Sequence, residues 1–504
     1  MPDIALDTAT LAELQAHLSD GEISAVALAE LCFARIDALD GGVNAIIERN
    51  PDALEIAATL DAERADGRVR GPLHGLPVVV KDNIDTSDRM TTTAGSIALQ
   101  DTRAARDAHV VERLRAAGAV IVAKSNLSEW ANFRSMQSSS GWSSRGGQTR
   151  NAYALDRTPG GSSSGSAVAT ACGFCAAAIG TETDGSVVGP AAMNGIVGLK
   201  PTVGLVSRSG IVPIAHSQDT AGPMTRSVAD AAVLLAAIAG PDPADPATEG
   251  ASGWPVDYLA ALTPDGLRGA RIGVVRTYCN LQAGVDRIFE ASLAALREAG
   301  AELIDPVDYA DLPRLTLAEV EVMSYEFKAD LDAYLAGRGA AAPVRSLDDV
   351  IAFNKVNADR AMPYFGQDRM LRAAAKGPLT ELAYREAVTT ARRLSRQEGI
   401  DAALAAHGLD ALVAPTTSAP WLIDWVNGDN RSIAAAQVPA VAGYPHITVP
   451  AGYLHGLPVG LSFIAGAFRE ATLLRLAYAF EQATNVRRPP PDPTPATIDF
   501  VDGG

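Results

Sequence analysis

Three short stretches of this sequence carry serine, lysine and glycine residues in an arrangement that could support nucleophilic catalysis. The segment 158–167 reads TPGGSSSGSA, and the segment 180–186 reads GTETDGS and ends on Ser186. The segment 77–85 reads PVVVKDNID and places Lys81 at the end of an apolar run. A serine hydroxyl is almost fully protonated at neutral pH, so it needs a base to remove its proton during attack. The chemistry therefore depends on whether a neighbouring segment supplies that base.

Lys81 is the candidate base, because the histidines offer none. They are scattered, without the spacing of a Ser-His-Asp site or a metal site, at positions 17, 74, 109, 216, 407, 446 and 455. A lysine can replace histidine when burial lowers its pKa and leaves the amine neutral. The valines before Lys81 predict at least partial burial. From Lys81 alone, however, the better interpretation is a lysine whose side chain extends to the surface or pairs with Asp82 or Asp85.

The glycines beside these serines have two interpretations. A Gly/Ser run is commonly a flexible linker, and GTETDGS also fits a loop between two elements. Alternatively, glycine lets the backbone approach a substrate closely, and successive N–H groups before a nucleophile can form an oxyanion hole. The N–H groups of Thr183, Asp184, Gly185 and Ser186 could converge on one oxygen in this way. Neither segment decides between the interpretations by itself.

The cysteines do not indicate a metal or disulfide centre. Cys172 and Cys175 form a CxxC pair in AVATACGFCAAAIG, but neither a second pair nor a histidine cluster accompanies it. With Cys32 and Cys279 they are too few for a disulfide framework in a chain of 504 residues. We expect buried structural thiols and no metal site.

Composition limits the partners of the protein. The chain has 42 Lys and Arg against 59 Asp and Glu, a net charge of −17, which disfavours nucleic acid because phosphate binding needs a basic face. No apolar run is long enough for a membrane helix, and the acidic start MPDIALDTATLAEL is unlike a signal peptide. We expect a soluble, cytoplasmic monomer or homodimer that acts on a small molecule or peptide, unless an export signal precedes this chain.

Hydrophobic patterning places these segments in an α/β protein. Helical periodicity, with a capping box from Thr10 to Glu13 and with Ser24 as an N-cap, predicts helices at the start of the chain. Short apolar runs that alternate with helices predict a largely parallel or mixed sheet, with strands at 78–80, 120–122, 272–275 and 411–414.

The same patterning suggests how the chain is divided. We expect an N-terminal helical segment at 1–65 that packs on the core, and one large domain at 66–485. Charged helical patterns at about 310–405 predict a helical region within that domain. The proline-rich tail at 486–504 is expected to be extended.

Considered together, the three catalytic segments resemble the amidase signature family. The match includes Lys81 in PVVVKDNID, Ser162 in GGSSSGSA, Ser186 in GTETDGS and the spacing of the two serines. AKSNLSEWA, GGQTRNAY, SQDTAGPM and AGYPHITVPAG also look like this family, and the resemblance spans about residues 20 to 485. It implies the amidase signature fold, with a central mixed, mostly parallel sheet surrounded by helices.

The resemblance also implies catalytic roles. Ser186 would be the acylated nucleophile, and Ser162 would be the bridging serine, joined to Gly161 by a cis peptide bond. Lys81 would be the final base, and the N–H groups of residues 183–186 would hold the oxyanion. This chemistry needs no metal and no organic cofactor.

Further residues carry supporting or substrate-binding roles by the same resemblance. Ser163 would support the hydrogen-bond network, and Asp219 in SQDTAGPM would order the backbone near the site. Asn132 and Phe133 lie where relatives in the family contact substrate, although core packing is the alternative for Phe133.

The sequence departs from a common family pattern at the nucleophile. Many members have Gly-Gly-Ser-Ile-Arg, whereas residues 184–188 here read DGSVV, which disfavours the glutaminase subunit of glutamyl-tRNA amidotransferase. SGWSSRGGQTRN and EGIDAALAAHGLDALVAPTT are similar to the bacterial peptide amidases, which remove the amide from C-terminal peptide carboxamides. A broad hydrolase of small aliphatic or aryl amides is the alternative. A non-catalytic binding subunit is disfavoured because Lys81, Ser162 and Ser186 are all retained.

Overall fold

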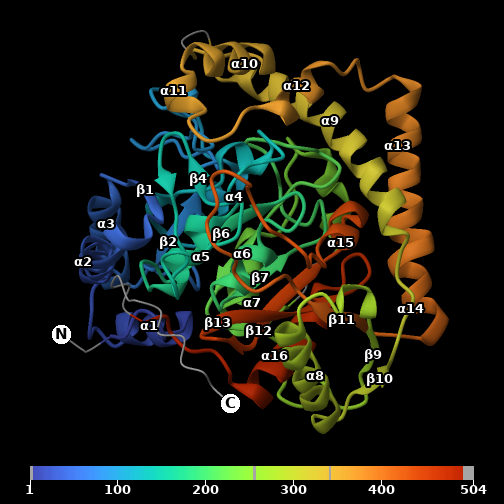
Figure 1. The fold of residues 1–504 in the computed structure, drawn as a ribbon. Coiled ribbons are helices and arrows are strands. Elements are labelled where there is room, and N and C mark those ends of the chain that lie inside the picture. Colours follow the sequence, from blue (N-terminus) through green and yellow to red (C-terminus); the bar gives the residue numbers. More distant parts are fainter. Residues whose placement is uncertain (1–3, 254–256, 340–341, 492–504) are drawn as a thin grey trace.

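One sheet forms the centre of the fold. The computed structural model describes residues 4–253, 257–339 and 342–491, and in these residues eleven strands pair in the order β1-β3-β2-β6-β8-β7-β12-β13-β11-β9-β10 (Figure 1). In that order the strands are Ile46–Arg49, Val120–Ser125, Pro77–Lys81, Ala177–Glu182, Thr220–Thr225, Val197–Lys200, His446–Leu454, Leu457–Ile464, Ala411–Pro415, Arg271–Val274 and Glu302–Ile304. A separate two-stranded ribbon pairs β4 (Trp142–Ser143) with β5 (Gly147–Gln148). The four predicted strands are confirmed as β2, β3, β9 and β11 of the one sheet.

The sheet is mixed, as predicted, but parallel pairs do not dominate it. Within the described residues, β2 is parallel to β3 and β6, and β9 is parallel to β10 and β11. The other six neighbouring pairs are antiparallel. The expectation of a mostly parallel sheet is therefore wrong. Alternating helices and apolar runs do not reveal strand direction, and hairpins such as β12–β13 reverse it.

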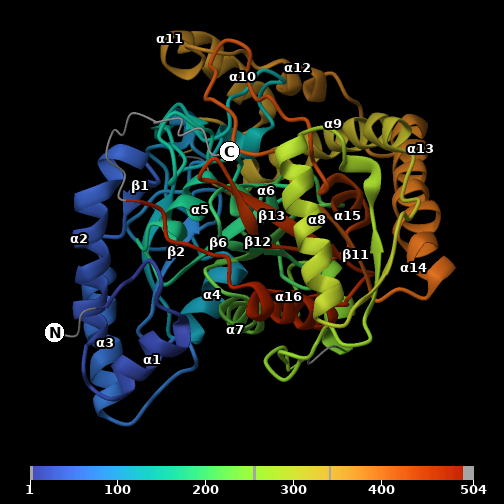
Figure 2. The same cartoon turned by 60° about the horizontal axis from the view of Figure 1, so that its bottom comes forward.

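Helices surround the sheet. α5 (Ser164–Ala171) packs on β2, β3 and β6, and α6 (Val188–Met193) packs on β7, β12 and β13. α4 (His109–Ala116), α7 (Val228–Ile238), α16 (Glu470–Thr484) and α8 (Ala283–Glu298) form a row in which each helix contacts the next (Figure 2). α15 (Gln437–Ala442) follows the long loop after β11.

A helical arm runs along one side of the molecule and across one end (Figure 1). It occupies the region in which the sequence predicts helices. Its members are α9 (Leu312–Gly337), α10 (Leu347–Val356), α11 (Ala358–Ala361), α12 (Asp368–Ala374), α13 (Leu382–Arg392), a π-helical turn (Arg393–Ile400) and α14 (Asp401–His407). α9 is the longest helix in the described part of the chain. It contacts the loop at 214–219, and that loop in turn contacts Thr183, just after the carboxyl-terminal end of β6.

The N-terminal segment contains α1 (Leu11–Ser19), α2 (Ala25–Val43) and α3 (Ala53–Ala65). The Thr10–Glu13 capping box and the Ser24 N-cap are both confirmed. The segment is not helical throughout, because β1 adds an antiparallel edge strand to β3. At the other terminus, residues 486–491 form neither helix nor strand, and the rest of the predicted extended tail, 492–504, lies outside the described residues.

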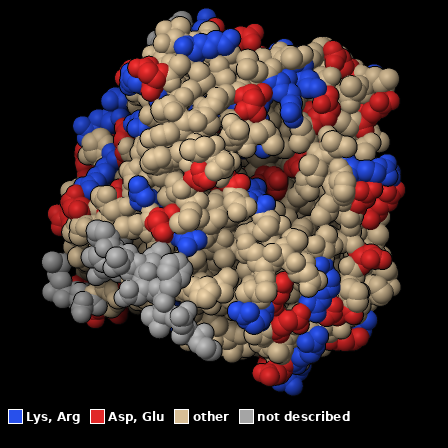
Figure 3. Space-filling view, viewed as in Figure 1, with Lys and Arg blue, Asp and Glu red and all other residues tan. Residues whose placement is uncertain are grey.

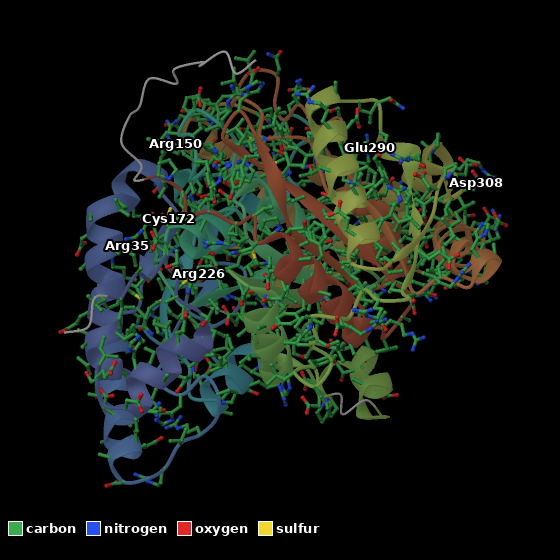
Figure 4. All side chains as sticks on the ribbon, turned by 90° about the horizontal axis from the view of Figure 1, so that it is seen from below. Arg35, Arg150, Cys172, Arg226, Glu290 and Asp308 are labelled. Carbon is green, nitrogen blue, oxygen red and sulfur yellow. The ribbon has the colours of Figure 1, made fainter. Side chains whose placement is uncertain are left out.

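The CxxC cysteines lie in the core, as predicted. Cys172 and Cys175 are buried, and burial raises the pKa of the Cys175 thiol to about 11. Arg226 donates to the Cys175 carbonyl (2.9 Å), and Arg35 donates to the Cys172 carbonyl. Figure 4 shows the two arginines on either side of Cys172. These backbone contacts tie the end of α5 to α2 and to the segment after β8.

The fold predicts a strong steric requirement at Gly165, in the first turn of α5. A Cβ atom there would lie 2.2 Å from the Ala45 carbonyl oxygen and 2.5 Å from that of Asn126. We expect Gly165→Ala to lower the free energy of unfolding by about 1–3 kcal/mol. Gly41→Ala in α2 is the matched control, because nothing lies within 4 Å of its added methyl group. That control should be neutral or stabilising by up to about 1 kcal/mol. Equal denaturant midpoints for the two variants would contradict this account of the α5 packing.

Candidate active site

Lys81 is the last residue of β2, and its side chain lies inside the protein. β2 is paired in register with β6, so Lys81 lies beside the end of that strand. Its Nζ lies within hydrogen-bond distance of Ser162 Oγ (2.7 Å), Thr181 Oγ1 (2.8 Å) and the Thr181 carbonyl oxygen (3.2 Å). The side chain is 0% exposed. The alternative in which Lys81 reaches the surface is therefore wrong.

Burial controls the protonation of this lysine. It lowers the pKa of Lys81 well below the ordinary value, because an ammonium group loses its hydration inside the protein. The carboxylates of Glu182 and Asp219 act in the opposite direction, with a smaller effect on the pKa. The amine is consequently suited to accept a proton from Ser162.

The serine run is a structured turn that leads into α5, and not a linker. The Gly161–Ser162 peptide bond is cis, as predicted. Ser163 Oγ donates to the Thr181 carbonyl (3.0 Å) and accepts from the Thr181 N–H (3.1 Å), which is the supporting contact expected of it. Ser164 Oγ donates to the Gly160 carbonyl (2.5 Å) as the helix begins. These bonds fix the Ser162 hydroxyl against the ends of β2 and β6.

Ser186 lies next to this turn, after β6. Its carbonyl accepts from the Ser163 N–H (3.1 Å), and the residue is 7% exposed. In the part of the chain that the structure describes, the Ser186 hydroxyl has no hydrogen-bond partner, so the predicted bond from Ser162 to Ser186 is not formed. The two serines are joined instead through the backbone at Ser163.

The turn before Ser186 leaves backbone donors free. The N–H groups of Asp184, Gly185 and Ser186 have no acceptor among the described residues. Just after the turn, Glu182 Oε2 accepts from the N–H groups of Val187 (2.7 Å) and Val188 (3.0 Å) and so caps α6. Free donors on a fixed turn are what an oxyanion hole requires.

Asp219 holds the start of the same turn. Its Oδ1 accepts from the Thr183 hydroxyl (2.5 Å), and its Oδ2 accepts from the N–H groups of Ile214 (2.8 Å) and Ala215 (3.0 Å). Burial raises the pKa of Asp219 to about 6. The carboxyl group therefore orders backbone, as expected from the sequence, and it makes no hydrogen bond to Lys81 within the described residues.

The two predicted substrate-contact residues make no hydrogen bond to Lys81, Ser162 or Ser186 within the described residues. Asn132 Oδ1 accepts from Ser138 Oγ (2.6 Å), and its backbone is left-handed, with φ at 73°. Phe133 is buried and packs on Phe327 of α9, with ring centroids 4.7 Å apart. The core-packing alternative for Phe133 is thus the one that the structure favours. Ala131, between Trp130 and Asn132, lines a cavity near the site instead.

Two cavities border the turn at residues 181–186. A small one, about 30 Å³, is lined by Gly160, Gly161, Asp184, Gly185 and Arg431. A larger one, about 440 Å³, reaches the other side of the turn at Thr181–Thr183. Figure 3 shows a hollow on the face of the molecule between the helical arm and the remaining structure, with acidic and basic atoms inside it. Asp184 and Gly185, whose N–H groups are unpaired among the described residues, line the smaller of the two cavities.

Sequence reasoning missed several residues of this site. Thr181 accepts two of the three Lys81 bonds, and Asn83 Nδ2 donates to its hydroxyl (3.0 Å). Gln218 contacts the turn from a loop, and Glu319 of α9 accepts a hydrogen bond from Gln218. Thr181 and Gln218 lie inside the GTETDGS and SQDTAGPM motifs, which could have indicated them. No sequence motif links Glu319 to the site, because it is distant from these motifs in the chain.

The structure also gathers one group of possible metal ligands in the described residues, His216, Glu326 and Asp330. Their donor atoms are used within the protein. His216 Nδ1 lies 2.9 Å from Asp330, while Glu326 accepts from the Ser217 N–H (3.0 Å) and the Tyr384 hydroxyl (2.6 Å). The group acts as a clamp between α9 and the loop at 214–219.

Comparisons with known proteins agree with the geometry. The family model described as Amidase matches residues 27–474. A probable amidase of Arabidopsis thaliana is 40% identical, over 96% of this chain and 92% of its own length. A glutamyl-tRNA(Gln) amidotransferase subunit of Exiguobacterium sibiricum is 38% identical, over 94% of this chain and 96% of its own length. The native peptide amidase structure from Stenotrophomonas maltophilia has a TM-score of 0.93 and 52% identity, covering 96% of this chain and 99% of that one.

The protonation of Lys81 predicts a pH-dependent stability. Since its pKa is far lower in the folded state than the ordinary 10.5, the unfolded chain binds one more proton between those two values. The stability of the native protein should therefore rise with pH relative to Lys81→Met, by up to about 1.4 kcal/mol per pH unit. Denaturant unfolding of both proteins at pH 7, 8 and 9 measures this difference. If the difference in unfolding free energy between the two proteins were the same at all three pH values, Lys81 would remain protonated in the folded state.

Proposed function

The chain belongs to the amidase family, and from that premise we propose that it hydrolyses C-terminal peptide amides through a Ser186–Ser162–Lys81 relay. Family membership and the peptide amidase likeness make the protein an amidase, a hydrolase that acts on amides. The observation that carries the relay is the 2.7 Å hydrogen bond between the buried Lys81 amine and Ser162.

Among the described residues, the helices are too short or too polar to cross a membrane.

In the proposed mechanism, Ser186 Oγ attacks the amide carbonyl carbon. Its proton passes to Ser162, and the Ser162 proton passes to Lys81, which becomes an ammonium. The N–H groups of the 183–186 turn stabilise the oxyanion of the tetrahedral intermediate. Lys81 then returns its proton through Ser162 to the nitrogen, which leaves as ammonia when the C–N bond breaks.

Water completes the proposed reaction. The same relay removes a proton from water as its oxygen attacks the acyl-enzyme ester, and the second collapse releases the acid and restores Ser186. The Ser162–Ser186 hydrogen bond has to form in the substrate complex, where catalytic hydrogen bonds commonly shorten. Lys81 is already buried in the resting site, so the lowering of its pKa by desolvation precedes substrate binding.

The choice of peptide amides rests on the similarity to the Stenotrophomonas maltophilia peptide amidase over nearly the whole chain. Two alternatives remain within the same chemistry. One is a broad hydrolase of small aliphatic or aryl amides. The other is a glutaminase subunit, which the amidotransferase relatives favour and the DGSVV sequence at the nucleophile disfavours.

We expect ammonia release to distinguish these substrates. The purified protein is assayed with an N-acetylated dipeptide amide, acetamide, benzamide and glutamine. The kcat/KM for the dipeptide amide should exceed each of the others by at least about tenfold, equal to about 1.4 kcal/mol of transition-state binding. The peptide bond inside the same dipeptide should remain intact. Faster turnover of benzamide or glutamine would instead support the corresponding alternative.

Mutation of the two serines should separate their roles. Ser186→Ala removes the nucleophile, so a fluorophosphonate probe should no longer label the protein. Ser162→Ala leaves Ser186 in place but breaks the relay, and it should lower kcat by about 10²–10⁴-fold. The loss should be larger for an amide than for the matched ester, because an ester leaving group depends less on receiving a proton.

A double variant tests whether Ser162 and Lys81 act as one unit. Lys81→Ala should resemble Ser162→Ala, and the two changes combined should be little worse than either alone, because residues of one relay are non-additive. Multiplicative losses would show independent roles. A Ser186→Ala protein that kept its rate would falsify the nucleophile assignment.

A further inference from the structure

α9 holds the loop at 214–219 with three carboxyl groups from one face of the helix. Asp330 accepts from the His216 N–H (2.9 Å), Glu326 accepts from the Ser217 N–H (3.0 Å), and Glu319 Oε1 accepts from Gln218 Nε2 (3.0 Å). These carboxylates share one face of the helix, since they are spaced by two turns and by one turn. The loop is thereby fixed between α9 and the end of β6.

Gln218 differs from its neighbours in this loop because it also contacts the catalytic turn. Its side chain is buried, and Nε2 donates to the Thr183 carbonyl (3.2 Å) as well as to Glu319. Glu319 is buried too, and its Oε2 accepts from Gln437 Nε2 of α15 (2.8 Å). Gln218 therefore connects two helices to one backbone carbonyl.

That carbonyl belongs to the peptide unit that supplies the Asp184 N–H. A trans peptide is planar, and its N–H points opposite to its C=O. While Gln218 holds the Thr183 oxygen on the loop side, the Asp184 N–H must point away from the loop. This N–H has no partner among the described residues. A rotated peptide would present an oxygen, instead of a donor, in that direction.

We propose that Gln218, anchored by Glu319 of α9, is a positioning residue that orients the Thr183–Asp184 peptide for oxyanion stabilisation. The inference rests on the proposed function, because it assumes an acyl-enzyme formed at Ser186. Asp219 restrains the Thr183 side chain, whereas Gln218 restrains the peptide plane itself. Two restraints on one residue leave the turn a single orientation before substrate arrives, which is the preorganisation that electrostatic catalysis needs.

Loss of the Gln218 contact should weaken stabilisation of the transition state and leave substrate binding nearly unchanged. Removal of a whole oxyanion donor typically costs about 10²–10³-fold in kcat. Loss of the group that orients a donor should cost less, and we expect about 10–100-fold for Gln218→Met, a change that keeps the volume of the side chain. KM should change by less than about threefold, because ground-state contacts of the carbonyl are weak.

The test compares two ligands that differ only in whether they can form an oxyanion. A peptide aldehyde matched to the amide substrate adds to Ser186, and the corresponding peptide alcohol does not. Gln218→Met should weaken aldehyde inhibition by the same factor as kcat, and should leave alcohol inhibition within about threefold. Glu319→Gln keeps an acceptor for Gln218 and should retain most activity, whereas Glu319→Leu removes the anchor and should resemble Gln218→Met.

Asp330→Asn is the matched control, because Asp330 holds the same loop from the same helix without contacting Thr183. It should leave kcat and aldehyde affinity within about threefold, even where it lowers the melting temperature as much as Gln218→Met does. Equal losses of aldehyde and alcohol affinity in Gln218→Met, or in Glu319→Leu if the former does not fold, would overturn the inference. An unmodified protein without amidase activity, or an active Ser186→Ala variant, would instead refute the proposed function.

Discussion

The site depends on a buried amine whose hydrogen-bond partners carry no charge. Lys81 Nζ contacts hydroxyl and carbonyl oxygens, and the two aspartates closest in sequence are engaged elsewhere. Asp82 accepts from the Thr93 hydroxyl and lies 3.6 Å from Arg145, while Asp85 pairs with Arg338 (2.9 Å). A direct carboxylate partner would stabilise the ammonium and hold the proton. Because those aspartates pair with other cations, desolvation is the main influence on the lysine, and it lowers the pKa of the Lys81 amine beside Ser162.

The carboxylates that do lie near Lys81 are used by the backbone. Glu182 accepts from two N–H groups at the start of α6, and Asp219 accepts from two N–H groups in the loop at 214–219. Hydrogen bonds from backbone amides stabilise a buried carboxylate, so these groups order the turn at both ends instead of serving as counter-ions in direct contact with the amine. The same two residues therefore order the turn before Ser186 and raise the pKa of Lys81 against the effect of burial, which links the backbone geometry of the site to the protonation of the lysine.

The departure of this chain from the common nucleophile pattern has a structural counterpart. Asp184, in place of glycine, lines the small cavity together with Arg431, and burial raises the pKa of its carboxyl group. Arg431 and Arg369 act in the opposite direction on that pKa. Burial and Asp184 raise the pKa of Glu319 on α9 to about 8, and Arg369 acts on it in the opposite direction. Ionisable groups from the helical arm and from the loop after β11 thus act on Asp184, two residues before Ser186.

The sequence alone was sufficient to identify the family and to place the candidate catalytic residues in motifs. Lys81, Ser162 and Ser186 stand in short motifs, the capping residues of α1 and α2 are local, and β2, β3, β9 and β11 are visible as apolar runs. Strand direction was not accessible, because an apolar run has the same pattern whichever way its neighbour points. The burial of Lys81 without a counter-ion in direct contact, the contact of Gln218 with the turn, and the bond from Gln218 to Glu319 were decided only by tertiary structure. Both depend on which distant side chains the sheet and α9 bring within hydrogen-bond distance, and a hydrogen bond between residues 101 positions apart leaves no mark on local composition.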